Sequence, residues 1–354
     1  MERGQGFAFL VHPEHRLADD VGRVCSQLGR APERFYDKAL RRIPGPQRPL
    51  AAVEIGGRQV GHVVLVPMGA RHLLEQRSTG RERVAWALDR ATALGAGVIG
   101  LGALTSTVTD GGTWLCGRAG LGVTNGHAFM AATLDAQVRD LLATAVHPRA
   151  ERHVAVVGAT GSVGTALVRL LTRDRAVDRL TLVARRMPPL TALAGELSNR
   201  VWTRVSDQIG TVADADLVVL LTASADTTLR AEHLGPDAVV LDSTQPRNTS
   251  RTLRQERPDV LVVDGGIVEI PSLRLRGGSI GLPDGRAYAS LAEAALLALS
   301  GHRGDYSIGS PSLELVDRTR ELAADLGHLG FRPAEPTSFG QPLTLPHVVR
   351  PHAA

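Results

Sequence analysis

The stretch HVAVVGATGSVG, residues 153–164, decides the fold of this 354-residue chain. Val154 to Val157 has the pattern of a short buried strand and runs directly into glycines, and Thr165 to Leu171 continues as a helix with one apolar face. The first glycines let the backbone turn sharply and approach a pyrophosphate, while Gly164 lets the helix pack tightly on the strand. The stretch therefore predicts a dinucleotide-binding turn; a glycine turn without a cofactor is the alternative.

Further apolar runs after this turn alternate with helical patterns, which is typical of a parallel, doubly wound Rossmann-type α/β sheet. The runs are residues 180–183, 217–221, 239–241 and 260–263. We expect four parts: an N-terminal α/β substrate domain (1–148), an NADP-binding Rossmann domain (149–286), a helical C-terminal segment closing on the cleft (287–334) and a loose tail (335–354).

The residues expected to bind the cofactor lie in the glycine turn and at the carboxyl ends of strands. An NAD-specific site offers an acidic residue after the second strand, whereas this chain has Arg185 and Arg186, which suit a 2′-phosphate and favour NADPH. A solvated basic loop is the alternative for these arginines. Gly265 and Gly266 follow the last strand, as a ligand-binding edge or as a tight turn alone. The full expected set is Gly158, Thr160, Gly161, Ser162, Val163, Gly164, Arg185, Arg186, Thr222, Gly265 and Gly266.

A second polar group, Asn125-Gly126-His127, lies between apolar segments of the N-terminal domain, downstream of Thr105-Ser106-Thr107. Its His127 is a candidate proton donor to the oxygen of a reduced carbonyl. The alternative is a helix cap, with Thr124 or Asn125 capping the helix expected over 128–141.

Composition narrows the class of function. A content of 43% hydrophobic and 21% charged residues suits a soluble globular chain of two or three domains. Aromatic residues make up only 3%, which disfavours a nucleic-acid site built on stacked rings. No run of 18 apolar residues occurs, so we expect no transmembrane segment. The two cysteines, Cys25 and Cys116, form neither a disulfide framework nor a CxxC pair, and a cytoplasmic location is the expectation.

Metal and lysine chemistry are also disfavoured by the residues. The histidines are scattered, and His12-Pro13-Glu14-His15 has the composition of a loop or cap more than of a metal site, so no metal is expected. Lys38 is the only lysine and lies in a polar stretch. A Tyr-x-x-x-Lys pair after the glycine turn is therefore absent, and a lysine Schiff base is disfavoured.

Several motifs together resemble the cyanobacterial long-chain acyl-[acyl-carrier-protein] reductases. The similarity covers most of the chain, and the Gly-Gly-Ile-Val-Glu and Ala-Glu-Ala segments are its specific parts. This resemblance implies an NADPH-dependent, aldehyde-forming reductase that takes its acyl substrate from a carrier protein. The motifs are Phe9–His12 with Glu14-His15, Gly102–Val108, Asn125–His127, Val154–Gly164, Leu182–Arg185, Asp242 with Pro246 and Asn248, Gly265–Glu269, and Ala289–Ala294 with Gly301 and Arg303.

The resemblance breaks at the nucleophile. Members of that family carry a cysteine that accepts the acyl group, and the matching position here is Ser290. An unassisted hydroxyl is a far weaker nucleophile than a thiolate. Three functions remain open: direct hydride reduction of an aldehyde, ketone or imine, with Ser290 as a hydrogen-bond donor; hydride reduction of a thioester delivered by an acyl carrier protein; and a non-catalytic relative that binds cofactor or carrier. Glu293 is expected either to orient Ser290 or to complement the dipole of its own helix.

Overall fold

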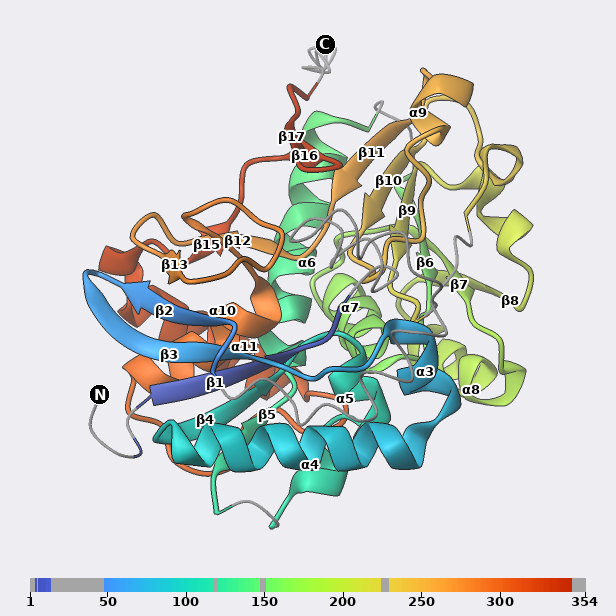
Figure 1. The fold of residues 1–354 in the computed structure, drawn as a ribbon. Helices are drawn as coiled ribbons and strands as arrows, with labels where there is room; N and C mark the ends of the chain where they lie inside the picture. The colour runs from blue at the N-terminus through green and yellow to red at the C-terminus, as the bar shows by residue number, and fades with distance from the viewer. Residues whose placement is uncertain are drawn as a thin grey trace, which may run out of the picture. The chain divides into compact units, whose positions relative to one another are not determined.

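The computed structural model describes residues 4, 6–13, 48–117, 120–146, 151–223 and 229–345 (Figure 1). The chain forms two compact units, each assembled from separate segments. Unit 1 comprises Met1–Phe129, Val268–Gly309 and Thr319–Arg332, and unit 2 comprises Met130–Ile267, Ser310–Arg318 and Pro333–Ala354. Each unit contains a six-stranded sheet with helices, which confirms the predicted α/β class. The sequence predicts consecutive domains that are divided at residues 148, 286 and 334. In the structure, each unit also includes segments from near the C-terminus of the chain.

Unit 2 holds the parallel sheet predicted from the glycine turn. Its strand order is β11-β10-β9-β6-β7-β8, and all neighbours are parallel. This doubly wound order reverses at β6 and β9, the point where ligands bind in such sheets. The strands are β6 (His153–Val157), β7 (Arg179–Val183), β8 (Trp202–Ser206), β9 (Leu217–Leu220), β10 (Val239–Asp242) and β11 (Leu261–Asp264).

Helices cover this sheet because their apolar faces complete its core. The strands at the centre are buried on both faces, as expected for parallel strands between helices. Leu167, Val168 and Leu171 pack in the same buried cluster as Val154 and Val156. The helical elements of unit 2 are α7 (Ser162–Arg173), α8 (Met187–Leu197), η3 (Ile209–Asp214), η4 (Ala231–His233) and α9 (Leu253–Glu256).

Unit 1 contains a mixed sheet of order β13-β2-β3-β1-β4-β5. Strands β3, β1, β4 and β5 are parallel, and β2 and β13 add to the edge antiparallel. This sheet belongs to the predicted α/β class, whereas the bounds and the substrate role predicted for the N-terminal domain stay predictions. The strands are β1 (Gly6–Val11), β2 (Ala51–Ile55), β3 (Arg58–Leu65), β4 (Ala96–Leu101), β5 (Gly122–Thr124) and β13 (Arg274–Arg276).

The helix α10 (Ala289–Leu299) packs on β1 and β4 of this sheet. Its residues Ala289 to Leu297 are buried. A Cβ at Gly100 would lie 2.7 Å from Cβ of Ala294, so a glycine in β4 permits the close approach. Whether the segment 287–334 closes a cleft stays a prediction. The other helical elements of unit 1 are α3 (Ala70–Glu75), α4 (Arg77–Ala93), α5 (Leu104–Val108), η2 (Thr113–Leu115) and η5 (Gly327–Leu329).

Two helices each contain residues of both units. They are α6 (His127–Thr144) and α11 (Leu313–Asp325). The short strands form a three-stranded sheet, β14-β12-β15 (Arg286–Tyr288, Ile267–Glu269, Arg332–Pro333), and a hairpin of β16 (Thr337–Ser338) and β17 (Gln341–Pro342). None of the helices within the described ranges is long and apolar enough to cross a bilayer.

The hairpin of β16 and β17 differs from the loose tail predicted from residue 335 onward. Its Thr337, Ser338 and Phe339 are buried. The buried carboxylate of Asp264, at the end of β11, accepts hydrogen bonds from Thr337 Oγ1 (2.7 Å) and from the backbone N–H groups of Phe339 and Gly340 (2.8 Å each). A buried carboxylate requires such donors, and the hairpin supplies them. Residues 346–354 lie outside the described part.

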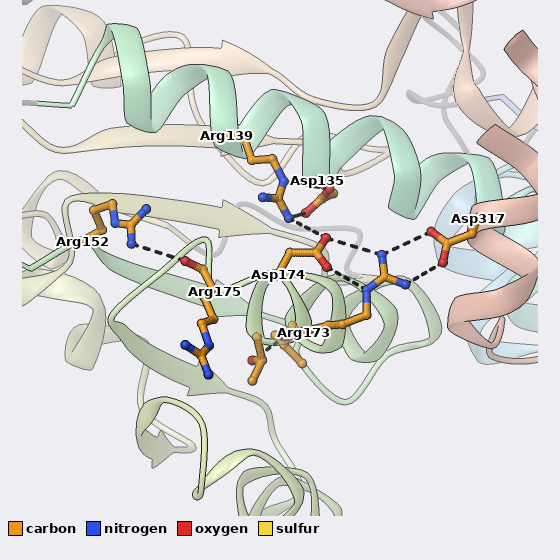
Figure 2. Close-up of polar contacts among 9 residues, drawn as sticks. Asp135, Arg139, Arg152, Arg173, Asp174, Arg175 and Asp317 are labelled. Atoms are coloured by element: carbon orange, nitrogen blue, oxygen red, sulfur yellow. Dashed lines mark hydrogen bonds and ion pairs between the residues drawn. The ribbon is translucent and has the colours of Figure 1, made fainter. Parts of the chain in front are cut away.

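A network of ion pairs joins three helices of unit 2 (Figure 2). Arg173, the last residue of α7, contacts Asp317 of α11 at 2.5 Å and Asp174 at 2.8 Å. Asp174 also pairs with Arg139 of α6 at 3.0 Å, and Arg139 in turn pairs with Asp135. A cation at the end of α7 complements the negative end of the helix dipole. Apart from the buried Asp135, these side chains are partly exposed, so the network links surface elements and is not a buried charge cluster.

Candidate cofactor and substrate sites

The glycine turn of unit 2 has the geometry that its sequence predicts. Gly158 has φ +92°, and a Cβ there would lie 2.8 Å from the Leu221 carbonyl and 3.1 Å from the Thr222 nitrogen. A Cβ at Gly164 would lie 2.4 Å from the Gly158 oxygen. Both contacts are with backbone atoms, which cannot swing aside as a side chain does. Only glycine therefore allows β6, the turn and α7 to approach this closely.

The start of α7 fits a pyrophosphate. Gly161 is the N-cap residue and is exposed, and the helix has no acidic residue in its first turn. The first N–H groups of any helix lack acceptors within the helix and carry its positive dipole end, which together attract an anion. Thr160, Ser162 and Val163 lie around this point and are all partly exposed. The start of α7 thus has the exposure and the dipole direction that an anion at a helix N-terminus requires.

Arg185 and Arg186 follow β7, on one side of the glycine turn. Both are exposed, and Arg186 occupies the N-cap position of α8. The Gly158 N–H donates to the Val183 oxygen at 2.8 Å, which ties the turn to the end of β7. The structure therefore places Arg185 at the same sheet edge as the turn, after the strand next to β6, as a 2′-phosphate site requires. A cofactor contact of these arginines stays a prediction.

On the other side of the turn, Thr222 follows β9 and is held by Asn248. Thr222 Oγ1 donates to Asn248 Oδ1. Asn248 belongs to the loop after β10, and its own backbone N–H donates to Thr244 Oγ1 at 2.7 Å. Asp242, the last residue of β10, is 3% exposed and accepts hydrogen bonds from this same loop. The sequence gives only a weak signal for this network, in the polar run Asp242-Ser-Thr244.

Gly265 and Gly266 form a tight turn whose N–H groups are used within unit 2. The Gly265 N–H donates to the Asp242 oxygen (2.8 Å), and the Gly266 N–H donates to Oε1 of Gln137 (2.9 Å). Gly266 has φ +70°, and a Cβ there would lie 2.4 Å from Sδ of Met130. The tight-turn interpretation therefore describes Gly266 well. Cofactor contacts of the two glycines remain predicted.

In unit 1, His127 and Ser106 lie together near the carboxyl ends of β4 and β5. His127 Nε2 is 3.3 Å from Ser106 Oγ. Burial lowers the pKa of His127 to about 4, opposed by a hydrogen bond with the Gly309 backbone. The imidazole is thus neutral at pH 7, so it can donate a hydrogen bond through one ring nitrogen, but it is not a charged acid.

Asn125 acts as a cap, which was the alternative for this motif. Its Oδ1 accepts the backbone N–H of His127, the first residue of α6, at 3.0 Å, and also accepts from Ser307 Oγ at 2.7 Å. Its Nδ2 donates to the carbonyl oxygens of Gly111 (3.0 Å) and Gly309 (2.8 Å). Asn125 is fully buried, so its role is to fix the loop that carries His127.

Ser290 lies directly against that loop. It is the second residue of α10 and is 8% exposed. Gly126 has φ +75°, and a Cβ there would lie 2.4 Å from both Cα and Cβ of Ser290. The structure therefore brings Ser290 and the His127 loop together, and their catalytic roles stay predictions. Within the described ranges, Ser290 Oγ makes no hydrogen bond to a side chain that could act as its base.

Glu293 faces the start of α6. Its Oε1 accepts from Thr124 Oγ1, and its Oε2 accepts the Phe129 N–H at 2.7 Å. Glu293 is fully buried, and burial raises its pKa to about 7 against these hydrogen bonds. The structure does not support either predicted role, because the carboxylate's partners are not Ser290 and because Glu293 lies beyond the first turn of α10. It caps a different helix, a contact across the chain that local sequence does not encode.

His12 is a structural histidine in the described residues. Its Nδ1 lies 2.9 Å from the Pro13 oxygen, and its Nε2 accepts the Leu104 N–H at 3.3 Å. Burial lowers its pKa, so it is neutral and suited to both contacts. Glu14, His15, Cys25 and Lys38 lie outside the described residues. Among the described residues, no group of three or more His, Cys, Asp or Glu side chains is arranged to hold a metal ion.

Comparisons with known proteins agree with the cofactor turn. Residues 153–251 match the family model of the semialdehyde dehydrogenase NAD-binding domain. The chain is 26% identical over 360 residues to aminotransferase PigE from Serratia sp., covering 97% of this chain and 41% of that protein. It is 28% identical over 185 residues to the long-chain acyl-[acyl-carrier-protein] reductase of Synechococcus elongatus, covering 51% of this chain and 52% of that protein.

The chain thus spans about half, or less, of the length of these curated relatives. Among solved structures, a malic enzyme from Entamoeba histolytica aligns with a TM-score of 0.44 at 13% identity, over 96% of this chain and 66% of that chain. The chain therefore resembles the long-chain acyl-[acyl-carrier-protein] reductases and, in residues 153–251 of unit 2, matches the NAD-binding domain of the semialdehyde dehydrogenases.

Proposed function

We propose that the protein is an NADPH-dependent reductase of an aldehyde, ketone or imine that uses direct hydride transfer without an acyl-enzyme. The observation that carries this proposal is Ser290: its Cα and Cβ lie against Gly126 of the His127 loop, and within the described ranges its hydroxyl makes no hydrogen bond to a base. Such a hydroxyl donates a hydrogen bond well and attacks an acyl group poorly. The match to an NAD-binding domain and the similarity to a reductase support the redox class.

Bound NADPH would supply a hydride to the carbonyl or imine carbon. The residues of unit 1 would then stabilise the negative charge that develops on the substrate oxygen or nitrogen. Ser290 Oγ–H and the neutral imidazole of His127 are the donors for this task, and Ser106 orients the imidazole through its Nε2. Because the pKa of His127 is about 4, the proton that completes the product would come from solvent through these hydroxyls and the ring, not from a stored imidazolium.

The preference for NADPH over NADH rests on Arg185 and Arg186. Both guanidinium groups are exposed beside the strand whose end contacts an adenosine ribose in this fold. Gly158, Gly161 and Gly164 would hold the pyrophosphate against the start of α7. A planar guanidinium can bind a phosphate with two parallel hydrogen bonds.

A second candidate is reduction of an acyl thioester to an aldehyde, with delivery by an acyl carrier protein. The similarity to a long-chain acyl-[acyl-carrier-protein] reductase favours it. The match to an aminotransferase is compatible with it, because a transaminase consumes a carbonyl compound such as an aldehyde. Here too the hydride would attack directly, since within the described ranges Ser290 makes no hydrogen bond to a base.

Cofactor titration followed by product analysis tests the proposal. NADPH fluorescence should report binding to the full chain at micromolar concentrations, and an alcohol or amine should form from a carbonyl or imine. An aldehyde from an acyl thioester would instead select the second candidate. Absence of NADPH binding would leave only a non-catalytic relative.

Variants of Ser290 sharpen this test. Ser290→Ala should lower kcat by about 10- to 100-fold with little change in NADPH affinity, as expected for loss of one donor to the developing charge. Ser290→Cys restores a thiol at the same place. If it creates aldehyde-forming activity and a trappable thioester, the pocket is built for acyl transfer, and the carbonyl proposal is wrong.

A further inference from the structure

Glu293 joins the helix that carries Ser290 to the loop that carries His127. It follows Ser290 by three residues in α10, and its carboxylate accepts hydrogen bonds from Thr124 Oγ1 and, at 2.7 Å, from the Phe129 N–H. Thr124 and Phe129 lie on either side of His127 in the chain. One side chain of α10 therefore binds the loop both before and after the imidazole.

The His127 loop and α10 are in close contact at Gly126. A Cβ at Gly126 would lie 2.4 Å from both Cα and Cβ of Ser290 and 3.0 Å from its carbonyl oxygen. Residues three positions apart lie on the same face of a helix, so Glu293 and Ser290 both face this loop. The hydrogen bonds of Glu293 therefore fix how the loop lies against Ser290.

Asn125 supports the same loop from a different side. Its Nδ2 donates to two backbone carbonyl oxygens outside α10, those of Gly111 and Gly309, and its Oδ1 accepts the first N–H of α6. Asn125 thus fixes the loop to other segments of unit 1, whereas Glu293 fixes it to the helix that carries Ser290. Loss of Glu293 should therefore shift the loop relative to Ser290 while Asn125 still caps α6.

The backbone N–H groups at the start of α6 are taken up by these two supports. The His127 N–H donates to Asn125 Oδ1 at 3.0 Å, and the Phe129 N–H donates to Glu293 Oε2. A hydrogen bond from the Ala128 N–H also lowers the pKa of Glu293 against its burial. Helix N-termini often offer such groups to an anion, but these are already bonded. The negative charge that develops on a substrate is therefore left to side-chain donors, whose placement matters more.

The chemistry of the Glu293 contacts says which replacement can hold the loop. Its pKa of about 7 means that about half of the molecules carry a proton on this carboxyl at neutral pH. A protonated carboxyl has one donor and one acceptor, as the amide of glutamine has. The hydroxyl of Thr124 can accept as well as donate. Glutamine can therefore keep both contacts, and alanine keeps neither.

From these contacts, and resting on the proposed function, we infer that Glu293 is a positioning residue for the reduction, because it holds the His127 loop on α10 and so places the imidazole relative to the Ser290 hydroxyl. In this role it acts through Thr124 and the backbone of the loop, not on the substrate. Its loss should lower kcat and leave the affinity for NADPH, which depends on unit 2, unchanged.

NMR of the imidazole groups tests the placement without a substrate. The full chain has 12 histidines, and the His127 signal is the one that disappears in His127→Gln. In the wild type His127 should stay neutral down to about pH 5, because burial lowers its pKa. Glu293→Ala should let water reach the ring and raise its pKa to above about 5. Loss of a nearby negative charge alone would lower the pKa of a histidine, so a rise reports a change of placement.

Steady-state kinetics with NADPH and hexanal connects this placement to the reduction. Glu293→Ala should lower kcat about 100-fold, the effect of misplacing catalytic groups by about 1 Å, and change the KM for NADPH less than about twofold. Glu293→Gln should return kcat to within about threefold of the wild type, and the pKa of His127 to its wild-type value.

A second pair of variants covers the case in which Glu293→Ala does not fold. Thr124→Val removes the hydroxyl that contacts Glu293 but keeps the shape of the side chain. It should lower kcat about tenfold and raise the pKa of His127, whereas Thr124→Ser should restore both.

Asp216→Ala is the matched control for loss of a buried carboxylate. Asp216 is 6% exposed and accepts the His153 N–H at 3.0 Å, but it precedes β9 in unit 2. Its loss should lower the free energy of unfolding and leave both kcat and the pKa of His127 unchanged. A merely structural role of Glu293 would give this same pattern in Glu293→Ala.

The outcomes distinguish this inference from the proposed function. If the wild type neither binds NADPH nor reduces hexanal, the proposed function fails, and the titration of His127 judges the placement by itself. If the wild type reduces hexanal, the inference alone is overturned by either of two results: His127 in Glu293→Ala titrates as in the wild type, or Glu293→Gln loses as much kcat as Glu293→Ala.

Discussion

The two units carry polar sheet edges that are made in different ways. In unit 2, the cofactor turn is built from backbone, with Gly158 and Gly164 in places where any side chain meets main-chain atoms. In unit 1, the candidate substrate site and its supports are built from side chains, and two of these have shifted pKa values: His127 in the site and the buried Glu293 beneath the start of α6. A site built from backbone groups contains no titrating side chain, so its charge does not change with pH. We therefore expect pH to change the stability of unit 1, and added side-chain volume to change cofactor binding by unit 2.

The largest expected effect is on unit 1. Glu293 holds its proton up to about pH 7 in the folded state, against an ordinary value of 4.5. Between these values the folded state binds the extra proton, so the free energy of unfolding falls as pH rises, by about 3 kcal/mol in all. Glu293→Gln should abolish this fall. Urea unfolding at a series of pH values from 4.5 to 8 measures it.

Titration of His127 changes the free energy of unfolding with pH in the opposite direction. His127 must therefore be present in both the wild type and Glu293→Gln. Its pKa is lowered from 6.5 to about 4, so its contribution to stability rises with pH over that range. The difference between wild type and Glu293→Gln isolates the carboxyl group. Glu75→Gln, at an exposed residue of α3, serves as control. Identical pH profiles for wild type and Glu293→Gln would remove the contrast between the units.

The next effect concerns unit 2. Gly164→Ala places a Cβ 2.4 Å from the Gly158 oxygen and 2.9 Å from Cα of Ala159, so the turn must shift. We expect the Kd for NADPH to rise about 50-fold. This is a loss of about 2 kcal/mol of binding free energy, a size typical of overpacking. Gly195→Ala is the control, because nothing lies within 4 Å of a Cβ there. Titration of both variants checks this, and unchanged affinity in Gly164→Ala would disprove a backbone-built site.

A smaller effect is expected for a side chain that is predicted to bind the 2′-phosphate. Arg185→Ala should raise the Kd for NADPH about tenfold and leave that for NADH unchanged, because only the 2′-phosphate contact is lost. Arg200→Ala, another exposed arginine of unit 2, should change neither. A parallel loss for NADPH and NADH would assign Arg185 to the solvated basic loop instead.

The smallest effect is expected far from both sites, in the ion-pair network of Figure 2. Arg173→Met removes the pairs with Asp317 and Asp174. Because these side chains are about one-third exposed, the free energy of unfolding should fall by less than about 1 kcal/mol, and less again at high salt. A double-mutant cycle with Asp317→Asn measures the coupling. Altered NADPH affinity in Arg173→Met would show that the network supports the cofactor turn.

Sequence predicts unit 2 well because its signals are local. Each central strand is a short apolar run, and the Gly158–Gly164 spacing specifies both the turn and its close approach. The carboxylates are different. Glu293 accepts a hydrogen bond from Phe129, 164 positions away in the sequence, and Asp264 accepts one from Phe339, 75 positions away. No neighbouring residue indicates these partners. The same holds for Ser290: the sequence places it on a helix, and only the fold places Gly126 against it.

The way α10 completes the sheet of unit 1 has a consequence for biosynthesis. This helix, buried from Ala289 to Leu297, comes from a segment that leaves the ribosome only after the six strands of the parallel sheet of unit 2, and the hairpin that satisfies Asp264 follows later still. A nascent chain that lacks the last third of the sequence cannot form the native core of either unit. Expression of an N-terminal fragment should therefore yield an aggregation-prone product with a bare sheet face, whereas co-expressed complementary fragments can reassemble.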